Sequence, residues 1–155
     1  IGHSLGAFVA PRIGAGDPAI AGLVLLAGNT RTLDVVIDDQ IKYLGASPED
    51  GARLKKAMPE AYWKDLSTYN PVATARGLKM PMLILQGERD YQVTMEDFKG
   101  WEPLRGPRVT LKSYPALNHL FQPGVGKAKP AEYGVAKPFD AGVIGDIAAW
   151  IRGIK

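Results

Sequence analysis

The first residues of the chain include a candidate nucleophile. Gly2-His3-Ser4-Leu5-Gly6 has the pattern G-x-S-x-G. A serine on a tight turn between a strand and a helix has a strained backbone, and side chains two residues before and after it would collide, which favours glycine at both positions. The pattern therefore predicts Ser4 as a nucleophile for acyl transfer and the amide of Leu5 as a donor to the oxyanion. The alternative is a chance match in a chain with 18 glycines.

Two histidines are available to activate such a serine. A serine hydroxyl is a poor nucleophile at neutral pH, so it needs a base that takes its proton and an acid that orients the base. His3 is adjacent to Ser4, and its side chain should point away from that of Ser4, which favours a packing or supporting role. His119 follows a predicted strand, where a side chain can reach over the sheet edge. We therefore expect His119 to be the base.

The acid must be chosen by position among 16 carboxylates. Asp90 directly follows the apolar run 82–86, so it should emerge at the carboxyl end of a parallel strand, where sites in open α/β sheets gather. The carboxylates of the predicted helices are expected to cap those helices or to lie in solvent: Asp34, Asp38, Asp39, Glu49 and Asp50. The sequence thus predicts Asp90 as the acid, with an ordinary turn aspartate as the alternative.

The elements that would position these residues follow an α/β pattern. Apolar or alternating runs predict strands at 20–27, 82–86 and 108–114. Helices are predicted at 5–14, despite Pro11, and at 94–101. A final helix at 140–154 has an apolar face made of Val143, Ile144, Ile147, Trp150 and Ile151. The segment 122–139, rich in glycine, proline and lysine, is predicted to be a loop that is functional or mobile.

Residues 29–79 have a different character, because three helices follow one another with no strand between them. The second of these helices begins with Ser47-Pro48, an N-cap followed by proline at the first helical position. Such a run predicts an insertion above the sheet, which in an enzyme would cap the site; plain surface helices are the alternative. In a cap, Tyr43 and Trp63, together with Tyr91, would supply an apolar wall for a substrate.

Composition limits the classes of function. Apolar residues make up 46% of the 155 residues and charged residues 23%, which is ordinary for a globular domain. The net charge of +3 comes from scattered lysines and arginines, so no nucleic-acid partner is expected. No apolar run approaches 18 residues, so we expect no membrane span. The absence of cysteine excludes disulfides, zinc thiolate sites and a thiol nucleophile.

Only Ile1 precedes the predicted turn at Ser4, although such a turn needs a buried strand leading into it. We therefore expect the chain to be part of a longer protein or to borrow a strand from a partner. Without that strand, 20–27 would be a sheet edge with unpaired backbone groups, and such edges favour pairing. The isolated chain is expected to associate through this edge with its missing N-terminal half or with a second copy, or else to aggregate.

Three stretches carry a resemblance to a known family: Gly2 to Gly6, Pro81 to Val93, and Asn118-His119-Leu120-Phe121. They resemble bacterial α/β-hydrolase esterases of the dienelactone-hydrolase and prolyl-oligopeptidase type. The order serine, aspartate, histidine is that of the α/β-hydrolases and differs from the orders in chymotrypsin and subtilisin. The resemblance covers the whole chain but only the second half of such an enzyme.

The resemblance implies the C-terminal part of an α/β-hydrolase fold, a mostly parallel sheet flanked by helices. It implies a serine hydrolase that cleaves small-molecule carboxylic esters through an acyl-enzyme, with Ser4, His119 and Asp90 as a triad and no metal or organic cofactor. The loop that gives the family its second oxyanion donor precedes the part matched here. A peptidase or acyl transferase with the same triad, or a catalytically silent fragment or binding module, stays open as an alternative.

Overall fold

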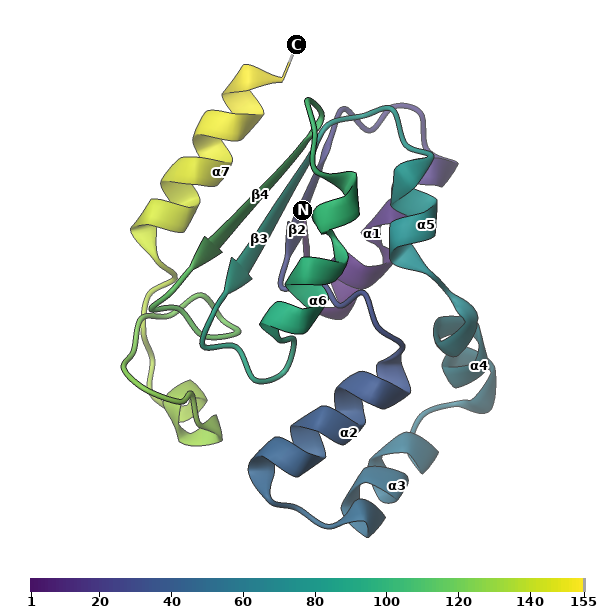
Figure 1. The fold of residues 1–155 in the computed structure, drawn as a ribbon, viewed down its shortest axis with the longest axis vertical. Coiled ribbons are helices and arrows are strands. Elements are labelled where there is room, and N and C mark those ends of the chain that lie inside the picture. The colour runs from purple at the N-terminus through teal and green to yellow at the C-terminus, as the bar shows by residue number, and fades with distance from the viewer. Residues whose placement is uncertain (155) are drawn as a thin grey trace.

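A single parallel sheet forms the centre of the chain, and its strands follow the chain order β1-β2-β3-β4 (Figure 1). The strands are β1 (Gly2–His3), β2 (Leu23–Leu26), β3 (Met82–Gly87) and β4 (Val109–Tyr114). The computed structural model describes residues 1–154. Every residue of β2 and β3 is buried, whereas β4 alternates between buried and exposed positions at its start. The two central strands are therefore covered on both faces, as their continuous apolar runs predict.

Helices cover both faces of the sheet. On one face lie α1 (Leu5–Gly16), α5 (Pro71–Arg76) and α6 (Met95–Gly100), and on the other lies α7 (Ala141–Gly153) (Figure 1). Because successive strand residues point to opposite faces, Leu25 and Ile84 join a core cluster with Trp101, whereas Leu26 and Leu85 join a second cluster. Among residues 1–154, no helix has both the length and the apolar character that crossing a membrane requires.

The helix predicted at 140–154 is α7, with nearly the predicted boundaries. Only part of its predicted apolar face packs on the core. Asp140 is the N-cap, and its Oδ1 accepts the amide N–H of Gly142 at 2.8 Å. Val143, Ile147 and Trp150 pack on the core. Ile144 and Ile151 instead remain 54% and 47% exposed.

Four helices, rather than the predicted three, separate β2 from β3. They are α2 (Leu33–Leu44), α3 (Pro48–Lys56), α4 (Glu60–Thr68) and α5. The first three extend beyond the carboxyl ends of the strands, and α5 returns to the sheet beside α1 (Figure 1). The prediction missed α5 because it has only six residues; its cap is Asn70, whose Oδ1 accepts the amide N–H of Ala73 at 2.9 Å. Ser47 is the N-cap of α3, as predicted, and it forms a capping box with Asp50.

Several predicted boundaries differ from the structure. The strand predicted at 20–27 is limited to Leu23–Leu26. The helix predicted at 5–14 continues to Gly16 with Pro11 buried inside it. The segment 122–139 is not a loop throughout, because it contains the 3₁₀ helix η2 (Pro130–Gly134). A second 3₁₀ helix, η1 (Glu102–Leu104), follows α6.

The prediction that β2 forms an unpaired edge is wrong for its carboxyl half. Gly2 pairs with Leu25 and His3 with Leu26 in a parallel register, which makes β1 a short neighbouring strand. The amide N–H of Ser4 then donates to the carbonyl of Leu26 at 2.8 Å. Two residues of β1 are too few to show a sequence pattern of their own, and pairing with β2 is what orders them.

Candidate active site

Ser4 occupies a strained turn between β1 and α1. Its φ of 55° and ψ of −122° lie where L-residues other than glycine are rarely found. The turn is held by the bond from the Ser4 amide to Leu26 and by the Ser4 carbonyl, which accepts the amides of Ala7 and Phe8 at 2.9 and 3.0 Å. Ser4 therefore lies at the carboxyl end of a strand and at the start of a helix, as the G-x-S-x-G pattern predicts. Leu5 is the first residue of α1, where amides lack an acceptor within the helix.

The two glycines of the turn are not equivalent. A Cβ atom on Gly2 would lie 2.4 Å from the carbonyl oxygen of Gly6, a distance that the backbone cannot tolerate. A Cβ atom on Gly6 would meet nothing within 4 Å. The expectation that both positions exclude a side chain is therefore confirmed at Gly2 and wrong at Gly6, because the close approach is of Gly2 to the Gly6 backbone.

Asp90 and His119 form a buried pair across two loops. The Nδ1 atom of His119 lies 2.7 Å from Oδ2 of Asp90, and the two residues are only 4% and 5% exposed. The other oxygen, Oδ1, accepts the amides of Gln92 and Val93 at 2.8 and 3.0 Å. Because a carboxylate can only accept, Nδ1 of His119 carries the proton, and a neutral ring then has its lone pair on Nε2. That is the tautomer a general base requires.

Gln86 supports this carboxylate, and the sequence analysis missed it. Its side chain, in β3, is 1% exposed, and its Nε2 donates to Oδ2 of Asp90 at 3.2 Å. The same nitrogen donates to the carbonyls of Gly87 and Val93 at 3.0 and 2.9 Å. The available signal was a single amide at the end of an otherwise apolar strand, where a buried polar group needs partners.

The ring of His3 contacts His119, although His3 as a whole remains exposed to solvent. Its Nε2 is 2.8 Å from the carbonyl oxygen of His119, and the two ring centroids are 4.7 Å apart. Since a carbonyl can only accept, His3 carries a proton on Nε2. Partial desolvation of the ring lowers the pKa of His3 and so favours its neutral form. His3 thus joins the turn of Ser4 to the loop of His119.

The loop that carries His119 is folded around Asn118. The Oδ1 atom of Asn118 accepts the amides of Leu120 and Gln122 at 3.0 and 3.1 Å. Phe121 has a φ of 54° and is fully buried, with its ring edge-on to His3. The loop lies directly on the end of β3, because a Cβ atom on Gly87 would be 2.6 Å from the Asn118 carbonyl oxygen. These contacts fix the backbone from which the imidazole projects.

An ion pair between Arg89 and Glu132 orders the segment 122–139. Nη2 of Arg89 lies 2.7 Å from Oε1 of Glu132, and the guanidinium also donates to the carbonyls of Val125 and Gly126. The other carboxylate oxygen of Glu132 accepts Nδ2 of Asn118 at 3.3 Å. Arg89 lowers the pKa of Glu132. The segment is therefore tied to the loops of both Asp90 and His119, which the sequence analysis did not foresee.

Three tyrosines stack beside Asp90. Tyr91 is parallel to Tyr43 of α2, with centroids 4.8 Å apart, and stacks on Tyr133 of η2 at 6.1 Å. The hydroxyl of Tyr43 donates to the carbonyl of Ala128 at 2.8 Å. Burial raises the pKa of Tyr91, and that of Tyr133 to about 12. A cavity of about 430 Å³ adjoins the stack and is lined by Tyr43, Leu44, Lys127, Ala128, Lys129, Pro130 and Ala131.

Trp63 takes no part in this stack of rings. It is half-buried on α4, a helix that Asp65 joins to Arg12 of α1 through a 2.6 Å ion pair. No hydrogen bond or ring contact within residues 1–154 joins Trp63 to the loops of Ser4, Asp90 or His119. In the same part of the chain, no group of three or more His, Asp or Glu side chains is arranged to hold a metal ion.

Comparisons with known structures identify the fold. The esterase Pf2001 of Pyrococcus furiosus matches 72% of this chain and 42% of its own, with 24% identity and a TM-score of 0.56. The esterase domain of a Rhodothermus marinus protein matches 76% of this chain and 49% of its own, with 15% identity and a TM-score of 0.54. No family model matches the chain. The chain thus has part of an α/β-hydrolase fold, as predicted.

A sequence relative gives a more particular likeness. Esterase EstD of Thermotoga maritima is 34% identical over 172 residues, which cover 97% of this chain and 42% of the relative. The chain therefore spans less than half the length of this curated relative. The likeness confirms the predicted resemblance to α/β-hydrolase esterases over a part of such a protein.

Proposed function

We propose that this chain carries the catalytic residues of a serine carboxylesterase. Ser4 is the nucleophile, His119 the general base and Asp90 the acid that orients it. The observation that carries the proposal is the buried 2.7 Å contact between His119 and Asp90, at the same sheet edge as the strained turn of Ser4. The likeness to esterases in sequence and fold supports the same activity.

The proposed reaction has two steps, each with a proton passing through His119. In the first, Nε2 of His119 takes the Ser4 proton while the serine oxygen attacks the ester carbonyl carbon. The tetrahedral intermediate then expels the alcohol oxygen, which receives that proton, and an acyl-enzyme remains. In the second, His119 deprotonates a water that attacks the acyl carbon, and the proton returns to Ser4 as the acid leaves.

Asp90 and Leu5 stabilise the charges that develop. The carboxylate of Asp90 holds His119 in the required tautomer and stabilises the imidazolium without itself becoming protonated. The amide of Leu5, at the positive end of the α1 dipole, donates to the oxyanion. The loss of one oxyanion donor costs on the order of 100- to 1,000-fold in turnover, so a second donor from outside this chain is part of the proposal.

The substrate wall is assigned to the tyrosine stack. Tyr91 follows Asp90 directly, and its stacking on Tyr43 brings α2 beside the site. This contact supports a cap made by residues 29–79, with Tyr43 and Tyr91 as its apolar surface. Trp63 is assigned to the structure of the cap, because its helix is joined to α1.

Burst kinetics test the proposal in the full-length protein. With a p-nitrophenyl ester, a serine esterase should release about one equivalent of nitrophenol before the steady state whenever deacylation is slower than acylation. Ser4→Ala should abolish both the burst and the turnover, whereas Ser67→Ala, on exposed α4, should leave both unchanged. Full turnover in Ser4→Ala, or cleavage of the matching p-nitroanilide alone, would contradict the esterase assignment.

A further inference from the structure

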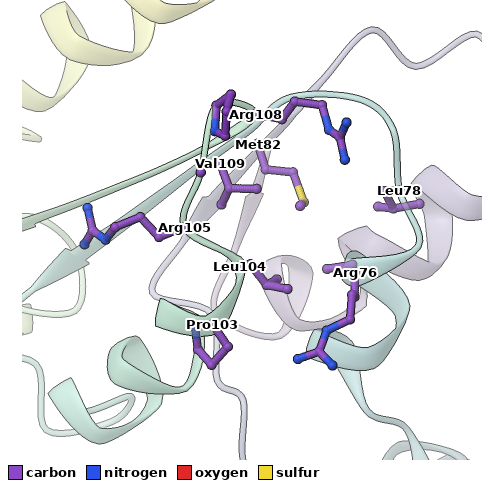
Figure 2. Close-up of a pocket in the computed structure, with 11 residues that line it drawn as sticks. Arg76, Leu78, Met82, Pro103, Leu104, Arg105, Arg108 and Val109 are labelled. Carbon is purple, nitrogen blue, oxygen red and sulfur yellow. The ribbon is translucent and has the colours of Figure 1, made fainter.

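A cavity of about 320 Å³ opens at the amino ends of β3 and β4 (Figure 2). Two of its lining residues, Met82 and Val109, are the first residues of β3 and β4, whereas Ser4 and Asp90 follow the ends of their strands. The cavity is lined by Ala75, Arg76, Leu78, Met82, Pro103, Leu104, Arg105, Gly106, Pro107, Arg108 and Val109. It is therefore separate from the proposed catalytic residues.

The floor of this cavity is apolar and its rim is cationic. Met82 and Val109 are 2% and 8% exposed and belong to the hydrophobic core. Arg76 ends α5 and Arg108 precedes β4. Figure 2 shows their guanidinium groups on opposite sides of the cavity, with Leu104 and Met82 between them. An occupant would thus meet hydrocarbon below and positive charge at the mouth.

The three arginines of the lining differ in the partners that they have. The guanidinium of Arg105 is held by both carboxylate oxygens of Glu102, at 2.8 and 2.9 Å, and points away from the cavity (Figure 2). Within residues 1–154, Arg76 and Arg108 make no ion pair, and no acidic side chain lines the cavity. Two cations at the mouth are therefore free to take an anion.

We propose that this cavity binds a small anion with an apolar body, of the class of medium-chain alkyl carboxylates. A carboxylate can accept charge-assisted hydrogen bonds from guanidinium groups, which match it in geometry. The alkyl chain would lie against the partly buried Leu78 and Leu104 and so remove its own apolar surface and theirs from water. The volume lies at the small end of the range of ligand cavities, about 300–1,000 Å³. An inorganic anion would leave the exposed surface of Leu78 and Leu104 uncovered.

The carboxylic acid product of ester hydrolysis belongs to this class of ligand. The connection between this cavity and the reaction product rests on the proposed function. Binding itself uses none of Ser4, Asp90 or His119. A carboxylate product held at the amino ends of β3 and β4 would therefore bind without competing for the nucleophile. If the esterase proposal fails, the binding site proposed here is unaffected. Measuring binding in Ser4→Ala separates the two proposals, because this variant lacks the proposed nucleophile but keeps every residue of the cavity.

Calorimetric titration of decanoate into full-length Ser4→Ala protein tests the site. We expect saturable binding that Arg76→Ala together with Arg108→Ala weakens at least about tenfold, the loss expected for hydrogen bonds to a charged group. Arg105→Ala is the matched control, because its guanidinium is already paired with Glu102; it should change the affinity less than twofold. The changed arginines are exposed, and circular dichroism should show an unaltered fold.

Two further ligands separate the contributions of charge and apolar surface. Decanol and inorganic phosphate should each bind at least about tenfold more weakly than decanoate. Amide hydrogen exchange should slow on decanoate binding at residues 75–78 and 104–109. The proposal is overturned if decanoate binds the double variant as tightly as its parent, if Arg105→Ala weakens binding equally, or if decanol or phosphate alone binds as tightly as decanoate.

Discussion

The Nε2–H group of His3 donates to the backbone carbonyl of His119 across 2.8 Å, and the two imidazole rings pack with centroids 4.7 Å apart. This contact joins the residue before the candidate nucleophile to the candidate base, 116 residues further along the chain. The positions of Ser4 and His119 are therefore coupled through one neutral side chain. From this contact we infer that His3 helps to position His119. That role is not evident from the place of His3 next to Ser4 in the sequence.

Replacing His119 should reduce turnover far more than replacing His3. His119→Ala eliminates the proposed base and should reduce kcat by about 10⁴- to 10⁶-fold. His3→Ala removes only a support and should lose far less, while His3→Gln, which keeps an N–H donor, should recover part of that loss. Steady-state kinetics with a p-nitrophenyl ester measure all three variants. Equal losses in His3→Ala and His119→Ala would show that His3 takes part in the chemistry.

The glycines of the nucleophile turn provide a matched pair. Gly2→Ala should lower the thermal midpoint and abolish turnover, because its Cβ would lie 2.4 Å from the Gly6 carbonyl oxygen. Gly6→Ala has open space and lies in α1, where alanine is favoured over glycine by about 1 kcal/mol. We expect it to keep or raise the midpoint in a calorimetric scan. A lower midpoint for Gly6→Ala than for Gly2→Ala would contradict the geometry of the turn.

The Arg89–Glu132 ion pair should make part of the stability depend on pH. Arg89 lowers the pKa of Glu132 below its usual 4.5 in the folded protein. The pair therefore stabilises the fold above that pH, and its contribution is lost as the pH falls through the depressed pKa. Denaturant unfolding should show Glu132→Gln less stable than the parent at pH 7, with the difference shrinking below about pH 4.5.

Glu49→Gln is the control for this measurement, since Glu49 lies in the first turn of α3, away from Arg89. Its stability relative to the parent should change little over the same range. A difference between the parent and Glu132→Gln that grows as the pH falls would have the wrong sign for a salt-bridged carboxylate.

The aromatic residues of the cap should affect substrate preference unequally. Tyr43 stacks on Tyr91 beside Asp90, so Tyr43→Ala should change the ratio of kcat/KM between short and long acyl esters. Trp63 lies on α4, which an ion pair joins to α1, so Trp63→Ala is the comparison variant and should change this ratio less. The two ratios are measured with p-nitrophenyl acetate and decanoate. If Tyr43→Ala lowers both rates in proportion, or if Trp63→Ala shifts the ratio more, the assignment of the wall to Tyr43 is wrong.

Local sequence patterns predicted the elements whose cause is local. The continuous apolar residues of β2 and β3 are buried on both faces, and the capping box of α3 lies within four consecutive residues. The two-residue strand β1 has no pattern of its own and exists because Leu25 and Leu26 pair with it. The six-residue helix α5 is similarly too short for a period to be visible.

The same distinction applies to the site. Ser4 could be singled out by the G-x-S-x-G pattern around it, and Asp90 and His119 because each follows a predicted strand. Gln86 and the ion pair of Arg89 with Glu132 could not, because their roles come from partners brought together by folding, 43 residues apart in the case of the ion pair. The contact of His3 with the His119 backbone is of the same kind.

Covalent labelling of the nucleophile tests the central claim most directly. A fluorophosphonate, added to the active full-length protein and followed by peptide mass spectrometry, should modify Ser4 and no other serine of this chain. His119→Ala should label much more slowly, because the serine then lacks its base. An adduct on Ser47, Ser67 or Ser113, or an active protein in which Ser4 remains unlabelled, would contradict the account.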